Sequence, residues 1–164
     1  MNHKKYIALA LALILGVYAI APLGIASAQT ANPLKNISLT DTTGQLTDAK
    51  FSVTRFAVEK GKVVAKGTLT GTLTGKQVNQ AVTMPVTTGQ HSCDILNLQL
   101  GPLDLNLLGL RVQLSQVNLD ITAVQGSGNL LGNLLCAVAK LLDGNGNAVG
   151  RLVKLLNDIL GALG

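Results

Sequence analysis

The chain has 164 residues, a formal net charge of +5 and 48% hydrophobic residues, but only 2% aromatic residues. Protein sites for sugars and for single-stranded nucleic acids depend on exposed aromatic rings against which the ligand stacks. The near absence of aromatic residues therefore argues against both ligand classes, and we expect no nucleic-acid partner.

The first 28 residues have the three parts of an export signal. A basic start, MNHKK, is followed by an apolar run over residues 6–25 and by the small-residue sequence Ala26-Ser27-Ala28. The sequence predicts cleavage between Ala28 and Gln29 and a secreted protein, extracellular or periplasmic. An uncleaved anchor is the alternative, because the apolar run is just long enough to cross a bilayer. A proline and a glycine just before the small-residue site favour cleavage.

Removal of the signal leaves 136 residues, the size of one domain, with a net charge of +3 because two lysines are lost. Residues 29–90 carry seven basic and three acidic residues, and the rest of the chain is nearly balanced. A scattered surplus of this size is more typical of solubility than of a binding patch. We expect a monomer.

Two cysteines, Cys93 and Cys136, are the only ones in the chain. An even number of cysteines in an exported protein predicts a disulfide. The bond closes a loop of about 43 residues and contributes on the order of 4 kcal/mol to stability.

Residues 29–49 are polar, and we expect an extended lead-in with an edge strand near residues 37–40. The segment FSVTRFAVE, residues 51–59, is rich in β-branched and aromatic residues that alternate with polar ones, as in a strand. Its alternation slips at Thr54-Arg55, which predicts a β-bulge. A turn at residues 59–62 leads into the next strand.

The segment VVAKGTLTGTLTG, residues 63–75, reads as a strand interrupted by three glycines. Glycines inside a strand mark bulges or strong bends, so we expect this strand to be curved. The segment QAVTMPVTT, residues 80–88, gives a further strand. Its Pro85 has no amide hydrogen and should face solvent at an edge or lie at a bulge.

Leucine recurs mostly at every second position in CDILNLQLGPLDLNLLGLRVQLSQVNLDITAV, residues 93–124. The apolar positions change parity, that is, they switch between even and odd residue numbers, at Gly101-Pro102, at Leu107-Leu108 and at Ser115-Gln116. A turn or bulge at each point is needed to keep one apolar face directed inward. Residues 103–124 therefore form either four short strands or two long bent ones, in an antiparallel sheet with one buried face.

Two amphipathic helices follow, at about residues 129–142 and 148–163. In the first helix, Gly132, Cys136 and Ala139 lie beside the leucine-rich arc, where small side chains let the helix approach the sheet closely. In the second helix, the side opposite the leucines carries Arg151, Lys154, Asn157 and Asp158, and Lys154 and Asp158 are spaced to form a pair.

These elements predict an α+β fold with one domain over residues 50–164. A curved antiparallel sheet of about five to seven strands packs against a C-terminal helical hairpin.

The motifs C-x-I-L-x-L-x-L-G-P-L, L-L-G-L, L-D-I-T-A and G-N-L-L-G-N-L-L-C occur in that order in this chain. In these motifs the chain resembles a group of small exported bacterial proteins with no settled activity. The resemblance covers residues 51–143, and both cysteines lie inside the shared motifs. It implies export and the disulfide, and it carries over no catalytic residue.

Two segments have some of the residue types of metal sites. His91, Cys93 and Asp94 offer ligands near Cys136, but the disulfide uses both thiols and the spacing matches no zinc pattern. The segment DGNGNA, residues 143–148, begins like a calcium loop but lacks the glycine and the glutamate that such a loop needs at its sixth and twelfth positions. We expect no metal and no cofactor.

No pattern of an activated nucleophile is present, and Asp94, Asp104, Asp120 and Asp143 are the carboxylates nearest to a hydrolytic pair. Those in strands alternate outward, where solvated side chains are the rule. We therefore expect an exported, non-enzymatic structural or binding module, with an apolar ligand between sheet and helices as one version. The alternatives are an envelope hydrolase that uses surface carboxylates and a membrane-surface protein that acts through its last helix.

Overall fold

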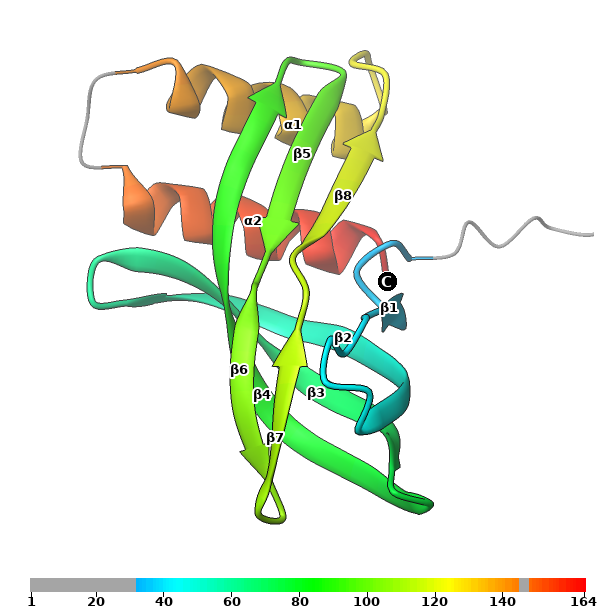
Figure 1. Cartoon of the computed structure of the whole chain (residues 1–164). Helices are drawn as coiled ribbons and strands as arrows, with labels where there is room; N and C mark the ends of the chain where they lie inside the picture. The colour runs from blue at the N-terminus through cyan, green and yellow to red at the C-terminus, as the bar shows by residue number, and fades with distance from the viewer. Residues whose placement is uncertain (1–31, 145–147) are drawn as a thin grey trace, which may run out of the picture. The chain divides into compact units, whose positions relative to one another are not determined.

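The residues that the structure describes form eight strands followed by two helices, joined by turns and loops (Figure 1). The structure is a computed structural model and describes residues 32–144 and 148–164. The strands are β1 (Ile37–Ser38), β2 (Leu46–Glu59), β3 (Lys62–Leu73), β4 (Lys76–His91), β5 (Ile95–Leu100), β6 (Leu103–Leu107), β7 (Leu110–Leu114) and β8 (Val117–Thr122), and the helices are α1 (Leu130–Leu142) and α2 (Val149–Ala162). The predicted export signal and its cleavage site between Ala28 and Gln29 lie outside the described residues.

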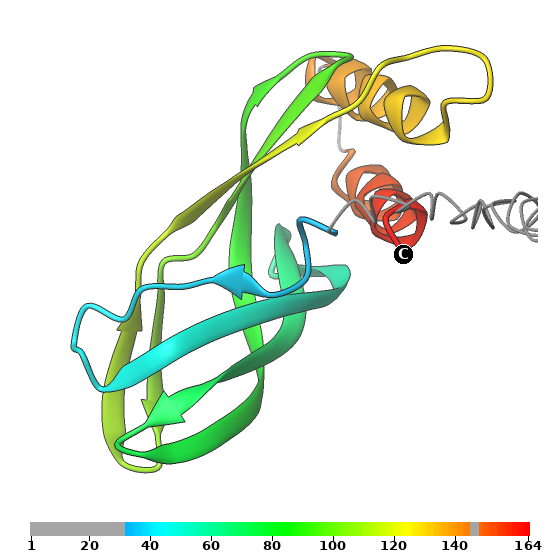
Figure 2. The same cartoon turned by 90° about the vertical axis from the view of Figure 1, so that its right-hand side faces the viewer.

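The strands form a six-stranded sheet with the order β1-β2-β3-β4-β5-β8 and a two-stranded ribbon of β6 and β7. Every pair is antiparallel, and the sheet curls strongly (Figure 2). The predicted α+β class, with a curved antiparallel sheet and a C-terminal helical hairpin, is confirmed.

The leucine-rich stretch folds as one long hairpin that is interrupted on both sides. β5 pairs with β8 near its base, and β6 pairs with β7 near its tip. The interruptions are residues 101–102 and 115–116, and the tip is the turn at Leu108-Gly109. Each parity change in the sequence therefore coincides with a break between strands. Residues 103–124 form three short strands, β6, β7 and β8, so neither alternative gives the correct count for that range. Together with β5 they make four short strands, which lie in two consecutive pairs.

Room for the largest core side chain is made by a glycine in β3. A Cβ atom on Gly67 would lie 2.1 Å from the carbonyl oxygen of Ser52 and 2.7 Å from the ring of Phe51. The ring of Phe51, which is fully buried, therefore occupies the space where any other residue would place its side chain. The predicted bulge in β2 is also present, as a register shift between Val53 and Arg55.

The segment after β1 joins two parts of the fold (Figure 2). On the side of β2, the Leu39 amide donates to the Ala49 carbonyl at 2.9 Å. On the side of β7, the amide of Ser115 donates to Thr40, and that of Thr42 donates to the Gln113 carbonyl at 2.8 Å. The predicted lead-in is thus part of the sheet structure, and β2 itself begins four residues before the expected domain boundary.

Both helices lie on the same side of the strands (Figure 1). α2 contacts β2 and β3, and α1 contacts β5 and α2. Buried side chains from the sheet, the β6–β7 ribbon and both helices form one apolar cluster, which includes Phe51, Leu69, Met84, Leu98, Val112, Leu135 and Leu156. The leucine face of the strands therefore packs against the helices in a single core.

The buried side of α1 combines part of the predicted leucine arc, with Leu135 and Val138 fully buried, and the small residues beside it. Leu130 at the start of the arc is 62% exposed, whereas Gly132, Cys136 and Ala139 are buried. A Cβ atom on Gly132 would lie 2.1 Å from the Val124 carbonyl oxygen. The small side of the helix thus packs directly on the chain that follows β8, and this close contact rotates the leucine arc partly toward solvent.

Replacement of Gly132 by alanine is expected to lower the free energy of unfolding by about 2 kcal/mol, because the new methyl group meets backbone atoms that cannot move aside easily. Gly150 in α2 is the matched control, since nothing lies within 4 Å of a Cβ placed there. Gly150→Ala should instead stabilise the protein by up to about 1 kcal/mol through helix propensity. Urea titration of both variants measures the difference, and equal effects would contradict the packing argument.

Candidate functional site

The sheet divides at Pro85. The ladder between β3 and β4 ends at the pair Val64 and Pro85. From Val86 onward β4 pairs with β5 on its other edge. Proline has no amide hydrogen to give to a ladder, and it is exposed at this position, as the sequence predicts. β3 and β4 therefore separate beyond this residue, and we call the opening between them the fork.

Backbone polar groups of β4 face into the fork. The Gly101 amide donates to the Pro85 carbonyl at 3.0 Å, so in this antiparallel pair Pro85 and Thr87 direct their backbone groups toward β5. The amides and carbonyls of Val86 and Thr88 alternate with them and point away from β5. The last pair of the ladder to β3 is Val64 and Pro85, so Thr88 has no paired residue in β3.

Helix α2 covers the fork and leaves a pocket of about 250 Å³. We call this the fork pocket, and it is lined by Val63 of β3, by Val86, Thr87 and Thr88 of β4 and by Leu152 and Leu156 of α2. All of these side chains are aliphatic except the two threonines. The site is therefore an apolar hollow with hydroxyl and backbone hydrogen-bonding groups along one wall.

Asn157 fixes α2 against the sheet. Its side-chain oxygen accepts the Phe56 amide at 2.8 Å, and its side-chain nitrogen donates to the Phe56 carbonyl at 3.0 Å. The Asn157 side chain thus forms with the Phe56 backbone the two hydrogen bonds that a neighbouring strand would form. Asn157, on the side opposite the leucines, is half-buried, whereas Lys154 and Asp158 form the expected pair at 2.8 Å.

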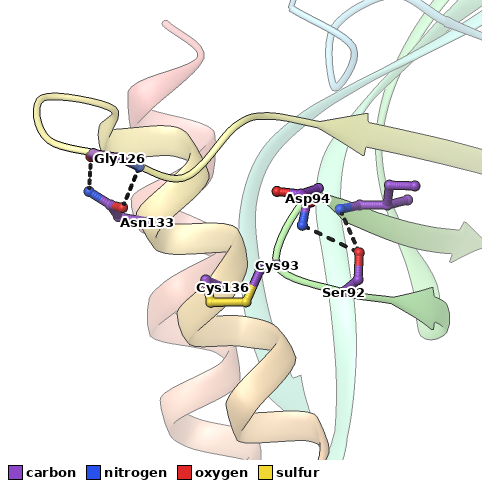
Figure 3. The surroundings of a disulfide bond; sticks show 7 residues. Ser92, Cys93, Asp94, Gly126, Asn133 and Cys136 are labelled. Carbon is purple, nitrogen blue, oxygen red and sulfur yellow. Dashed lines mark hydrogen bonds between the residues drawn. A yellow bond between two sulfur atoms is a disulfide. The ribbon is translucent and has the colours of Figure 1, made fainter.

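Helix α1 is tied to the turn between β4 and β5 by a disulfide (Figure 3). Cys93 lies in this turn, and Cys136 lies near the middle of α1, 43 residues later. The turn is ordered by Ser92, whose hydroxyl accepts the amides of Asp94 and Ile95 at 3.3 and 3.2 Å.

The start of α1 has its own attachment to the chain that follows β8. The Asn133 amide group donates to the Gly126 carbonyl at 3.0 Å, and its side-chain oxygen accepts the Gly126 amide at 3.3 Å. Two regions of α1 are therefore anchored, one by sulfur and one by an amide pair (Figure 3).

His91 lies beside the disulfide, but both of its ring nitrogens already have partners. Nδ1 lies 3.1 Å from the Gly89 carbonyl, and Nε2 lies 3.2 Å from the Asp143 carboxylate at the end of α1. Over residues 32–144 and 148–164, no three His, Cys, Asp or Glu side chains are grouped as metal ligands would be. The segment that resembles a calcium loop includes residues 145–147, which lie outside the described part.

The carboxylates that a hydrolase would pair are separated by the fold. Asp104 of β6 binds Arg111 of β7 at 2.5 Å. Asp120 of β8 accepts the Asn97 side chain of β5 at 2.8 Å, and Asp94 lies in the turn before β5. The hydrogen bond from Arg111 lowers the pKa of Asp104, which keeps this carboxylate ionised rather than available as an acid. None of these aspartates lines the fork pocket.

Asp41 is the carboxylate that sequence reasoning missed. It accepts amide hydrogen bonds of 2.8 to 3.0 Å from four residues, namely Thr43, Gln45, Leu46 and Gln113, and also binds the Thr43 hydroxyl. Partial burial alone would raise the pKa of Asp41. The hydrogen bonds outweigh burial and lower the pKa to about 2. Asp41 thus joins the β1–β2 connection to β7, and its role is structural.

Among the described residues, neither helix is long and apolar enough to cross a membrane. No family model, curated protein or solved structure matches the chain.

Proposed function

We propose that the protein is an exported, non-enzymatic binding module and that the fork pocket receives a small amphiphile, meaning an apolar chain with one polar group. The observation that carries this proposal is the composition of the pocket wall. Aliphatic side chains of Val63, Leu152 and Leu156 offer an apolar surface. The two threonines on the same wall and the backbone of Thr88, which has no paired residue in β3, offer hydrogen bonds to a single polar end.

The volume of the pocket limits the size of the ligand. Pockets for drug-sized molecules span roughly 300–1,000 Å³, and the fork pocket, at about 250 Å³, is smaller. At roughly 30 Å³ per water-sized group, it holds about eight such groups. A short chain of about this length therefore suits the site better than a full lipid.

Export is supported by the disulfide, because such bonds persist in oxidising compartments. The resemblance to small exported bacterial proteins adds to this support.

The two alternative functions have less support. A hydrolase would need two carboxylates close to each other, and those of the described strands are each engaged by a different neighbour. Insertion of α2 into a membrane would need its apolar side, but Leu152, Leu156 and Ile159 are buried in the core. A membrane-surface role through this helix would therefore require α2 to leave the sheet.

Binding of 1-octanol, measured by isothermal titration calorimetry, tests the proposal. Val63→Phe places a ring in the pocket and should weaken binding at least tenfold. Val124→Phe is the matched control, because Val124 is 73% exposed and does not line the fork pocket. Native mass spectrometry of the gently purified protein should show a bound small amphiphile that Val63→Phe lacks. Absence of octanol binding to the parent protein, or equal binding by both variants, would contradict the proposal.

A further inference from the structure

The positive charge of the protein is concentrated at one end of the β2–β3 hairpin. Residues 55–66 contain Arg55, Lys60, Lys62 and Lys66 and one acidic residue, Glu59, for a net charge of +3. Residues 29–164 as a whole also carry +3, so the remaining residues of that range balance to zero. We call residues 55–66 the basic hairpin end.

The register of the two strands places like charges next to each other. Arg55 of β2 lies directly opposite Lys66 of β3, and like charges at directly opposite positions destabilise a sheet. The charge of Lys66 is balanced by Glu59, whose carboxylate lies 2.5 Å from the Lys66 ammonium group. Within the described part of the chain, Arg55, Lys60 and Lys62 form no salt bridge. Three exposed positive charges are thus left to the solvent.

A β-bulge directs Arg55 onto this surface. The register shifts by one residue between Val53 and Arg55, and the Thr54 hydroxyl holds the bulge by donating to the Lys66 carbonyl at 2.9 Å. A regular strand would point Arg55 toward the opposite face of the sheet. The bulge therefore brings the positive charges of Arg55 and Lys66 together. Basic residues that served only solubility would not need to lie next to each other.

Hydroxyl side chains surround this pair of charges on the outer face of the sheet. Ser52 and Thr68 form the next row along the two strands, and Thr83 of β4 lies opposite Lys66. This part of the face carries no aromatic side chain for base stacking. Val58, the large exposed aliphatic residue of the basic hairpin end, alternates toward the opposite face of the sheet. The chemistry of this part of the face complements anionic oxygen atoms along an extended ligand.

We propose that the basic hairpin end and the hydroxyl row beside it bind a linear polyanion made of repeating phosphate groups. The polymer lies along the outer face, with its phosphates against Arg55, Lys60 and Lys62 and hydrogen bonds from Ser52 and Thr68. This surface is distinct from the fork pocket and does not depend on it. Binding releases condensed counterions, so the affinity falls as salt concentration rises.

Long-chain inorganic polyphosphate is the probe, and its binding is measured by biolayer interferometry over a range of salt concentrations. The triple variant Arg55→Gln, Lys60→Gln, Lys62→Gln should bind at least tenfold more weakly at low salt. The slope of log affinity against log salt should become shallower by about 2, at roughly 0.7 for each phosphate that is no longer neutralised on a single-stranded polyanion. The control triple variant Lys76→Gln, Lys140→Gln, Lys154→Gln removes the same net charge elsewhere and should keep the parent slope.

Three outcomes would overturn the proposal. The first is an equal loss of binding in both triple variants, which would mean that net charge alone attracts the polymer. The second is absence of polyphosphate binding by the parent protein. The third is binding to vesicles of anionic phospholipid through the same three residues without polyphosphate binding, which would assign the surface to membranes. Unchanged circular dichroism and melting temperature show that the variants are folded.

Discussion

Replacement of Cys93 and Cys136 by alanine is expected to lower the free energy of unfolding by about 4 kcal/mol. The disulfide closes a loop of 43 residues, and the loss of unfolded-chain entropy for a loop of this length corresponds to roughly that energy. A domain of this size has a total stability of about 5–15 kcal/mol, so the variant should be markedly less stable. Urea denaturation of the parent and the double alanine variant measures the difference.

Hydrogen exchange shows where the stability is lost. Among the helices and strands, α1 has its main contacts with α2 and β5, and its start is also bonded to Gly126 after β8. The disulfide is its covalent attachment to the sheet, so residues 130–142 should lose protection first in the double variant. α2 is held independently by the Asn157 contacts and should stay protected for longer. Uniform loss of protection over the chain would contradict the view that the disulfide chiefly anchors α1, although it would leave the loop-entropy estimate intact.

Replacement of Asp41 by alanine is expected to lower the free energy of unfolding by about 2–3 kcal/mol. The substitution leaves four amide donors without their acceptor, and hydrogen bonds to charged groups contribute about 1.5–3 kcal/mol each before solvent replaces them. Because this carboxylate is partly exposed, water takes over part of that role and the four bonds do not add. Asp41→Asn should fall between the parent and the alanine variant in urea denaturation.

The contribution of Asp41 should also depend on pH. The pKa of Asp41 rises from about 2 in the folded protein to its ordinary value of 3.8 on unfolding. Ionised Asp41 therefore stabilises the fold fully above pH 3.8, and this stability is lost as the pH falls toward 2. Asp41→Asn, which has no charge to titrate, should show a shallower decrease in stability over that range.

Asp104→Asn is the matched control for the acid titration. The Arg111 hydrogen bond also lowers the pKa of Asp104, so the direction of the effect is the same. This side chain is half exposed, and its contribution should be smaller than that of Asp41. A larger effect at Asp104 than at Asp41 would contradict the structural role given to the β1–β2 connection.

The parts of the fold that the sequence predicts are those with local signals. Every parity change in residues 93–124 marks a break because one extra residue would otherwise expose a whole leucine row. The bulge at Thr54-Arg55 and the exposure of Pro85 follow from the same kind of local argument. The helices begin and end within one residue of the predicted bounds, because their apolar periodicity is long and bounded by turn residues.

The features that sequence reasoning missed depend on partners far along the chain. The sequence DTTG, residues 41–44, signals a turn in which an aspartate accepts nearby amides, but its fourth partner, Gln113, is 72 residues away. Asn157 lies on the polar side of an amphipathic pattern. Its partner is the backbone of β2, and a backbone group leaves no mark in the sequence that would point to Asn157. The fork pocket requires the registers of β3, β4 and β5 together. Local patterns determine the elements, whereas such long-range pairings determine the site.

The position of Asp41 between β2 and β7 has a kinetic consequence. The bonds from Thr43, Gln45 and Leu46 are local, but the bond from Gln113 closes a chain of 72 residues, and the entropic cost of such closure grows with length. Local hairpins such as β2–β3 and β6–β7 have a much smaller closure cost and should assemble earlier. We therefore expect residues 39–42 to dock on β7 late in folding, after the rate-limiting barrier. Substitutions at Asp41 should accordingly accelerate unfolding and leave the refolding rate nearly unchanged.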